Sequence, residues 1–306
     1  MIYWMRRRPA PWRKALKALT FLTGAAALAV DVHPAMTQTP LDLYRERVAM
    51  SAAGGQCQLF DAGTAAALAA GSAQARTAAL RAGYAVQALD NGAADARAQV
   101  ARMACGSPRL QRAAAEARDA FRAYSGLRRM TFPGDVSAWR ADRGMSQQSG
   151  AWRLAQDAWA GEDKVVFGVA GQQGAQTMAL SVASSDGASP YAARLIVRDI
   201  ARLPEPQVQP GAASLQARAP LRAAAKVILA EAKAPADPAM RPQGASKAIA
   251  FRFPAAAQQM LEQLDPREAV SVEILYPSAR GDVVRTAFLE VGDFDAGVAF
   301  LKTAAR

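Results

Sequence analysis

Two cysteines and a group of acids near the C-terminus are the residues of this chain best suited to chemistry. The acids are Asp265, Glu268, Glu273 and Glu290. Two carboxylates that converge in a cleft could act as acid and base in the hydrolysis of a glycan. Each also suits a structural role, since Asp265 precedes a proline at a predicted turn and Glu273 falls on the polar side of a predicted strand. We favour structural roles for all four and keep hydrolysis as the alternative.

Cys57 and Cys105 flank a predicted helical segment. In an oxidising compartment such a pair forms a disulfide, and we predict this bridge. The single histidine, His33, lies near the N-terminus, so a cysteine–histidine pair or a serine–histidine–aspartate triad lacks its base. Two cysteines without histidines do not supply a zinc site. We therefore expect no metal and no cofactor.

Three tryptophans, Trp139, Trp152 and Trp159, fall within 21 residues, and the first two are followed by arginine. On the surface they could stack on sugars or make cation–π contacts. Buried, they are the largest residues of a core, which is the interpretation we favour. The run GVAGQQG over residues 168–174 lacks the lysine and hydroxyl residue of a phosphate-binding loop, so it predicts a hairpin turn.

The N-terminus has the order of a secretory signal peptide. Residues 1–29 contain six basic residues and no acid, and their second half is a short apolar stretch that ends in small residues. A membrane-spanning helix needs about 20 apolar residues, which is longer than this stretch. We predict a cleaved leader over 1–29, a linker over 30–40 and a periplasmic or secreted protein; an uncleaved membrane anchor is the alternative.

The charge of the chain falls when the leader is removed. The formal net charge of the whole chain is +11, and a chain beginning at Val30 would carry +5. This is not the profile of a dedicated nucleic-acid binder. The sequence leaves the partner unknown, with an envelope component or an anionic surface as candidates, and it predicts membrane contact solely through an uncleaved leader.

Residues 41–126 have the pattern of a small alanine-rich helical bundle. Thr39 and Pro40 open a first helix that the glycines at 54 and 55 should end. Asp61 should cap a second helix that stops at Gly83. A short segment at 84–89 and a further helix after the DNG tripeptide should follow, and Ser107 with Pro108 should begin the last helix.

The remainder of the chain favours antiparallel sheets. Within 127–202, four period-two runs between 151 and 200 predict a four-stranded meander. Residues 203–247 contain seven prolines and read as a linker whose middle, LRAAAKVILAEA, is compatible with a short helix. Residues 248–306 predict a strand, a helix, a hairpin and a final helix that Asp293 or Asp295 should cap. The fold class is therefore α+β: a helical bundle, antiparallel sheet units and a C-terminal strand-helix-hairpin-helix.

Several runs resemble exported alphaproteobacterial proteins of unknown function. They include ACGSPRL at 104–110, MTFPGDVSAWRADR at 130–143 and FLEVGDFDAGVAFL at 288–301. The helical part with its cysteine before GSPRL is also similar to helical domains of the lysozyme-inhibitor type, which carry more cysteines. The resemblance implies a periplasmic address and no activity. We therefore expect a non-catalytic binding or accessory module of the envelope, with a carboxylate-dependent glycan hydrolase as the alternative.

Overall fold

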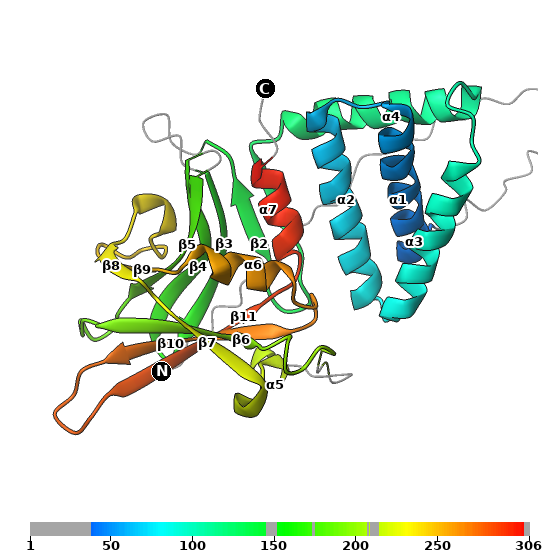
Figure 1. The fold of residues 1–306 in the computed structure, drawn as a ribbon. Coiled ribbons are helices and arrows are strands. Elements are labelled where there is room, and N and C mark those ends of the chain that lie inside the picture. Colours follow the sequence, from blue (N-terminus) through cyan, green and yellow to red (C-terminus); the bar gives the residue numbers. More distant parts are fainter. Residues whose placement is uncertain (1–37, 145–151, 173–174, 207, 209–213, 303–306) are drawn as a thin grey trace, which may run out of the picture. The chain divides into compact units, whose positions relative to one another are not determined.

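Four helices form the N-terminal part of the fold (Figure 1). The computed structural model describes residues 38–144, 152–172, 175–206, 208 and 214–302. The helices are α1 (Pro40–Cys57), α2 (Ala62–Arg81), α3 (Val86–Ala101) and α4 (Pro108–Ser125). α1 packs on both α2 and α3, and small side chains such as Ala75, Ala79 and Ala93 fill the shared core. Alanines let the helix backbones approach closely, which explains how a bundle with few large side chains holds together.

The predicted caps are present at the first two helices. Thr39 and Asp42 form a reciprocal capping box at α1, and Asp61 accepts the backbone N–H of Thr64 at α2. Two predicted boundaries are wrong. α1 continues through Gly54 and Gly55 to Cys57, and α3 is one helix that runs through the predicted break at 90–92. The tertiary packing of α1 and α3 outweighs the helix-breaking tendency of those residues.

A disulfide joins Cys57 to Cys105, as the sequence predicts. Cys57 is the last residue of α1, and Cys105 lies in the loop between α3 and α4, with 5.5 Å between the two Cα atoms. The bridge therefore ties the end of the first helix to the start of the last. It fits a chain that folds outside the reducing cytoplasm.

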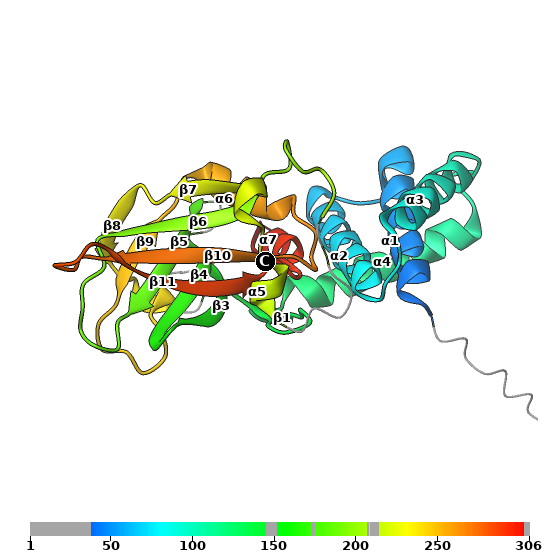
Figure 2. The same ribbon diagram turned by 90° about the horizontal axis from the view of Figure 1, so that it is seen from below.

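The described residues also form two antiparallel sheets (Figures 1 and 2). The larger has the strand order β1-β2-β3-β4-β5-β9-β8, and the smaller has the order β11-β10-β6-β7. The strands are β1 (Arg129–Phe132), β2 (Trp139–Asp142), β3 (Trp152–Ala160), β4 (Asp163–Gln172), β5 (Ala175–Ala183), β6 (Ala192–Arg198), β7 (Ala225–Leu229), β8 (Ala232–Pro235), β9 (Ile249–Arg252), β10 (Ala269–Tyr276) and β11 (Val283–Glu290). Figure 2 shows the strands of the smaller sheet side by side, overlying the larger one.

The predicted four-stranded meander is wrong in its last strand. β3, β4 and β5 follow one another in the larger sheet, but β6 crosses to the smaller sheet and pairs with β7 and β10. The connection over 184–191 is longer than a hairpin turn, so it can reach the second sheet. The predicted hairpin joins β4 to β5, because Gln172 pairs with Ala175, but Gly168 and Gly171 are strand residues of β4. A Cβ at Gly168 would lie 1.9 Å from the Leu154 carbonyl oxygen, so this close approach requires glycine.

The segment 203–247 contains strands where the sequence suggested a helix within a linker. Residues 225–229 form β7, which pairs with β6, and 232–235 form β8. The predicted helix over LRAAAKVILAEA is therefore wrong, because the β-branched pair Val227–Ile228 fits the edge of a sheet better than a helix. A short helix, α5 (Leu215–Arg218), and two 3-10 turns, at 222–224 and 238–240, complete the described part of the segment.

The C-terminal elements are those predicted: β9, α6 (Ala255–Glu262), the hairpin β10–β11 and α7 (Phe294–Lys302). They do not form a sheet of their own. β9 pairs with β5 and β8 in the larger sheet, whereas β10 pairs with β6 in the smaller. Each sheet therefore draws strands from three of the segments that the sequence separates.

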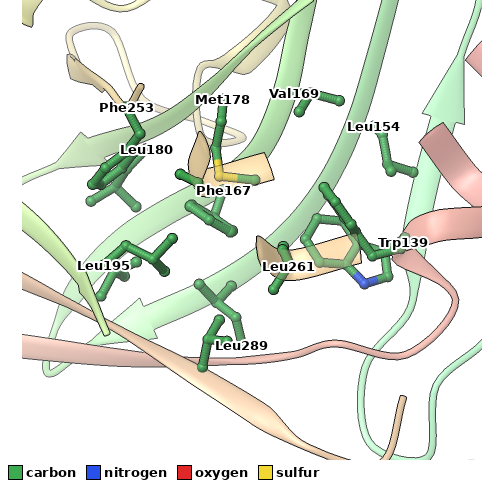
Figure 3. Close-up of a cluster of buried hydrophobic side chains, with 14 of the residues drawn as sticks. Trp139, Leu154, Phe167, Val169, Met178, Leu180, Leu195, Phe253, Leu261 and Leu289 are labelled. Carbon is green, nitrogen blue, oxygen red and sulfur yellow. The ribbon is translucent and has the colours of Figure 1, made fainter. Parts of the chain in front are cut away.

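The core lies between the two sheets (Figure 3). Phe167, Leu180 and Met178 of the larger sheet face Leu195 and Leu289 of the smaller. Helices α6 and α7 add further side chains, among them Leu261 of α6. Period-two alternation places these side chains on the inner faces, and their burial is the main favourable contribution to folding.

Helix α7 also packs against α2, which joins the helical part to the sheets (Figure 1). Across this contact Arg81 of α2 donates to Asp293, with 2.5 Å between Arg81 Nη1 and Asp293 Oδ1. Asp293 is buried, and its other carboxylate oxygen has no hydrogen-bond partner. Burial raises the pKa of Asp293, and the hydrogen bond from Arg81 opposes this shift.

Candidate functional site

Glu268, one of the four candidate acids, is held by an arginine at the end of β6. Arg198 Nε and Nη2 donate to the two carboxylate oxygens of Glu268, each at 2.8 Å. Both side chains are about 95% buried, at 4% and 5% exposure. The hydrogen bond to Glu268 raises the pKa of Arg198, although burial works against this. A carboxylate in a bidentate pair of this kind has no open face toward a substrate.

Asp265 lies in the same turn as Glu268 but has an arginine of its own. Arg267 donates to Asp265 from its backbone N–H and Nε at 2.9 Å each, and from Nη2 at 3.0 Å. The backbone N–H of Asp265 donates to Glu268 Oε1 at 2.9 Å. The structure thus brings these two acids together, in a turn that each of them stabilises.

Glu273 is paired with Arg194, which lies directly opposite it on β6. The expectation that Glu273 faces water is wrong, because only 9% of its side chain is exposed. Its position on the outer face is as predicted, but Arg194 pairs with it and Arg222 Nη2 lies 3.9 Å from its Oε1. The pair is a cross-strand ion pair of the smaller sheet.

Glu290 binds the backbone of the loop between β1 and β2. Its Oε1 accepts the N–H of Asp135 at 2.6 Å, and its Oε2 accepts those of Val136 and Ser137 at 2.9 and 2.8 Å. The side chain is fully buried. A Cβ at Gly134 would lie 2.5 Å from Oε2, so the loop can wrap the carboxylate because this residue is glycine.

The tryptophans divide between core and surface. Trp139 is fully buried and donates its indole N–H to the Glu290 and Val291 carbonyl oxygens, and Trp152 is also buried. The sugar-stacking alternative is therefore wrong for both of these residues. Trp159 differs, since 59% of it is exposed and Lys164 Nζ lies 5.6 Å from its ring centroid. Trp159 is the tryptophan that a ligand can reach.

A pocket opens at the end of β5, where the loop 184–190 faces β8 and the segment 236–249. We call it the β5–β8 pocket. Its volume is about 680 Å³, within the range of roughly 300–1,000 Å³ that is typical of small-molecule sites. Apolar side chains line one part of it: Val182, Pro190, Pro235 and Ile249.

Basic and hydroxyl side chains line the rest of the β5–β8 pocket. The basic residues are Lys233, Arg241 and Lys247, and the hydroxyls are Ser184, Ser189 and Ser246. No carboxylate lines the pocket, and among the described residues none lies within 4.0 Å of a charged nitrogen of the three basic residues. The pocket is therefore an electropositive site with an apolar wall.

A charged cluster fixes the loop that forms one wall of the pocket. Asp186 Oδ1 accepts the Ser184 hydroxyl at 2.7 Å and the Ala188 N–H at 3.0 Å, and its other oxygen pairs with Arg285 of β11. These hydrogen bonds, from Arg285 first, hold the pKa of Asp186 well below its usual range. These contacts fix the conformation of the loop that forms part of the pocket wall.

The same cluster reaches into the core through Asp163. This buried carboxylate accepts Arg285 Nη1 at 2.8 Å, the Tyr276 hydroxyl at 2.5 Å and the Ser185 N–H at 2.9 Å. Burial alone would raise the pKa of Asp163, but these hydrogen bonds lower it overall. Burial and the bond to Asp163 raise the pKa of Tyr276. Asp163 therefore anchors the loop at 185 to both sheets.

A second cavity, of about 460 Å³, lies between α1, α2 and α4, and we call it the helical groove. Leu43, Met50, Leu68 and Phe121 are among its lining residues, and Glu46, Arg47 and Glu116 add charge. Asp265, Glu268, Glu273 and Glu290 line neither the helical groove nor the β5–β8 pocket. This placement favours structural roles for all four acids.

Sequence reasoning missed the β5–β8 pocket because its basic residues lie in the segment that reads as a linker. Lys233, Arg241 and Lys247 follow no helical or strand period. The loop 184–190 approaches them only because β6 changes sheets after it. The signal that could have been used is local: between residues 232 and 249 the chain has three basic residues and one acid, Asp237.

The described residues hold no group of three histidine, cysteine, aspartate or glutamate side chains that could bind a metal ion. None of the described helices is long and apolar enough to cross a membrane. Comparisons of the chain with protein families, curated proteins and solved structures found no match.

Proposed function

We propose that the protein is a non-catalytic binding module of the bacterial envelope, and that the β5–β8 pocket is its ligand site. The observation that carries the proposal is the composition of this pocket: apolar side chains, hydroxyls and three basic residues, with neither a carboxylate nor a histidine. Such a lining can hold a ligand in one orientation, and it offers no carboxylate or imidazole for general acid–base catalysis.

The state of the candidate acids supports the same proposal. A glycan hydrolase needs one carboxyl group that gives up a proton and another that stabilises the reacting sugar. Here Glu268 is enclosed by Arg198, and Glu290 is enclosed by backbone N–H groups. Neither has room for a glycosidic oxygen within hydrogen-bond distance.

Export is part of the proposal and rests on two supports. One is the predicted leader over residues 1–29, which lies outside the described residues. The other is the Cys57–Cys105 disulfide, because such bridges persist in oxidising compartments such as the periplasm. The intact mass of the protein purified from the native envelope tests it. A mass of a chain cut near Ala29 supports export, and a full-length mass with free thiols contradicts it.

The binding proposal is tested with the fluorescent dye 1-anilinonaphthalene-8-sulfonate, which joins an aromatic body to an anionic group. We expect one saturable site that Ser189→Trp blocks, because Ser189 lies in the pocket wall. Ala115→Trp, at an exposed position of α4, is the matched control and should leave binding unchanged. Dye binding that Ser189→Trp does not reduce would overturn the assignment of the site.

The absence of catalysis is tested separately with dye-labelled peptidoglycan. We expect no release of dye by the purified protein. Release that disappears in Glu268→Gln, with the far-UV circular dichroism unchanged, would contradict the proposal and support the hydrolase alternative.

A further inference from the structure

Among the described residues, no carboxylate pairs with the three basic residues of the β5–β8 pocket, of which Arg241 is half-buried and Lys233 and Lys247 are exposed. Arg198, Arg153 and Arg285 each pair with a carboxylate. Among the described residues, Lys233 Nζ has the Ser189 hydroxyl as its one hydrogen-bond partner, at 3.4 Å. Lys233 and Lys247 are exposed, so water solvates their charge, and desolvation is a cost chiefly at the half-buried Arg241. The pocket therefore has an excess of positive charge that a bound anion would neutralise.

Arg241 is the second basic residue of the pocket whose side chain lacks a charged partner among the described residues. Its side chain is half-buried, and its Nε is buried without a hydrogen-bond partner. Because this atom is closed to solvent, a ligand in the pocket would pair with the other guanidinium nitrogens of Arg241. A guanidinium matches a carboxylate or a phosphate because its planar donors can bind two oxygens at once.

The apolar side chains of the pocket wall favour a hydrocarbon group. Val182, Pro190, Pro235 and Ile249 carry no polar side-chain atoms, and the first two of these residues are buried. Water against such a surface is displaced favourably by hydrocarbon, at about 25 cal/mol for each Å² that is buried. A purely ionic ligand would leave this part of the pocket unused.

We propose that the β5–β8 pocket binds a small amphiphilic anion, in which a carboxylate or phosphate group is attached to a short hydrocarbon chain. The anionic group lies at Arg241, Lys233 and Lys247, and the chain lies against the apolar wall. The inference rests on the proposed function, since it names the class of ligand for the same site.

The experiment is isothermal titration calorimetry with compounds that share an eight-carbon chain, each kept below the concentration at which it forms micelles. Octanoate and octyl phosphate should bind at least tenfold more tightly than octanol, and octylamine should not bind. The affinity of octanoate should fall as sodium chloride is raised from 0.05 to about 0.5 M, because salt screens the basic residues. Inorganic phosphate alone should bind at least tenfold more weakly than octyl phosphate.

Variants connect the binding to the pocket. Arg241→Met and Lys247→Met keep most of the side-chain length and remove the charge, so each should weaken octanoate binding about threefold to tenfold and leave octanol binding unchanged. Lys226→Met, at an exposed position of β7 outside the pocket, is the matched control and should change neither. A fold check by thermal unfolding accompanies each variant.

The outcomes separate the two proposals. If none of the octyl compounds binds and the dye does not bind either, the assignment of the pocket as a ligand site fails. If octanol or octylamine binds as tightly as octanoate, or if Arg241→Met has no effect, the site stands and the anionic class is wrong. If inorganic phosphate binds as tightly as octyl phosphate, the apolar wall has no part in recognition and the amphiphilic class is wrong.

Discussion

The carboxylate of Glu290, at the end of β11, accepts the backbone N–H of Ser137 at 2.8 Å, in the loop that connects β1 to β2. Glu290 belongs to the smaller sheet and Ser137 to a loop between two strands of the larger, so this contact links the sheets at one end of the core. The Gln156 side chain of β3 strengthens the link, because it donates to the Glu290 carbonyl oxygen and accepts its N–H. Glu290, a candidate catalytic acid from the sequence, thus joins the edge of the larger sheet to the smaller sheet.

Glu290→Gln should destabilise the protein by about 1–3 kcal/mol. The amide keeps one oxygen acceptor but turns an N–H₂ group toward backbone N–H donors, which leaves at least one buried donor unpaired. The free energy of unfolding in urea measures the effect. Glu231→Gln, at an exposed position with no side-chain partner among the described residues, is the control and should change stability by less than about 0.5 kcal/mol. Equal losses in both variants would contradict the structural role of Glu290.

Arg81→Met should be among the most destabilising single changes at the contact between α2 and α7, by roughly 3–5 kcal/mol at neutral pH. It leaves the buried carboxylate of Asp293 without its charged partner. The double variant Arg81→Met with Asp293→Asn should recover part of this loss, because the amide carries no charge to bury. Urea unfolding of the two single variants and the double variant gives the coupling energy, which should be about 1–3 kcal/mol. Strictly additive losses would show that the pair is not coupled.

The loss in Arg81→Met should also depend on pH with a defined sign. Burial raises the pKa of Asp293, so folding takes up a proton in the range between its unfolded and folded values. The unfavourable contribution of the buried Asp293 carboxylate to stability is therefore largest above its folded pKa. This contribution disappears as the pH falls through the folded pKa toward about 4. Unfolding measured from pH 7 to pH 4 should show the difference between Arg81→Met and wild type shrinking on acidification, and a constant difference would contradict this account.

Asp163 should show the opposite dependence on pH. Its pKa is lowered in the folded protein, so its contribution to stability is present above the unfolded pKa of about 3.9 and is lost as the pH falls through the folded value. Asp163→Asn should cost roughly 2–3 kcal/mol at pH 7, where the charged acceptor of Arg285 and Tyr276 is lost. As the pH falls from about 4 through the folded pKa of Asp163, the stabilities of Asp163→Asn and the wild-type protein should converge.

The control for Asp163 is Asp90→Asn, at an exposed position of α3. Its difference from wild type should stay near zero across the same pH range. A difference for Asp163→Asn that stays constant from pH 7 down to pH 2 would mean that the ionised carboxylate is not the source of the stabilisation.

The sequence predicts the local structure of this protein better than its topology. Thr39, Asp61 and Pro108 mark helix starts because capping depends on residues within one turn of each other. The strands β3, β4 and β5 follow from period two. The move of β6 to the smaller sheet has no such signal, because it depends on which edge is free once the chain has folded. For the same reason the local sequence of β7 is compatible with a helix, although pairing with β6 makes it a strand.

The candidate site shows the same limit more sharply. Residue type identifies Glu268 and Glu290 as chemically capable, but their partners decide their roles. The arginine that binds Glu268 lies 70 positions away, and the backbone N–H of Asp135 that binds Glu290 lies 155 positions away. The sequence does not mark Arg241 and Lys247 as binding residues, because their capacity to bind an anion depends on the absence of acids around them in the folded protein. A sequence shows which residues are present, whereas an unneutralised charge is a property of the folded surroundings.

Reduction of the Cys57–Cys105 disulfide should destabilise the helical part by about 2–4 kcal/mol. The bridge connects residues 48 positions apart, and a cross-link over such a span restricts the unfolded chain and removes much of its entropy. The cost should fall mainly on α1, α3 and α4, which the bridge joins, because the sheets have their own core. Hydrogen exchange with and without a reductant should show faster exchange in these helices and smaller changes in β3, β4 and β10.

The double variant Cys57→Ala with Cys105→Ala controls for effects of the reductant and should reproduce the exchange pattern of the reduced protein. Two results would contradict the role assigned to the bridge. One is a uniform rise in exchange across both parts, which would mean that the helices and the sheets unfold as one unit through the contact of Arg81 with Asp293. The other is no change at all, which would mean that packing of the alanine-rich core holds the helices without the bridge.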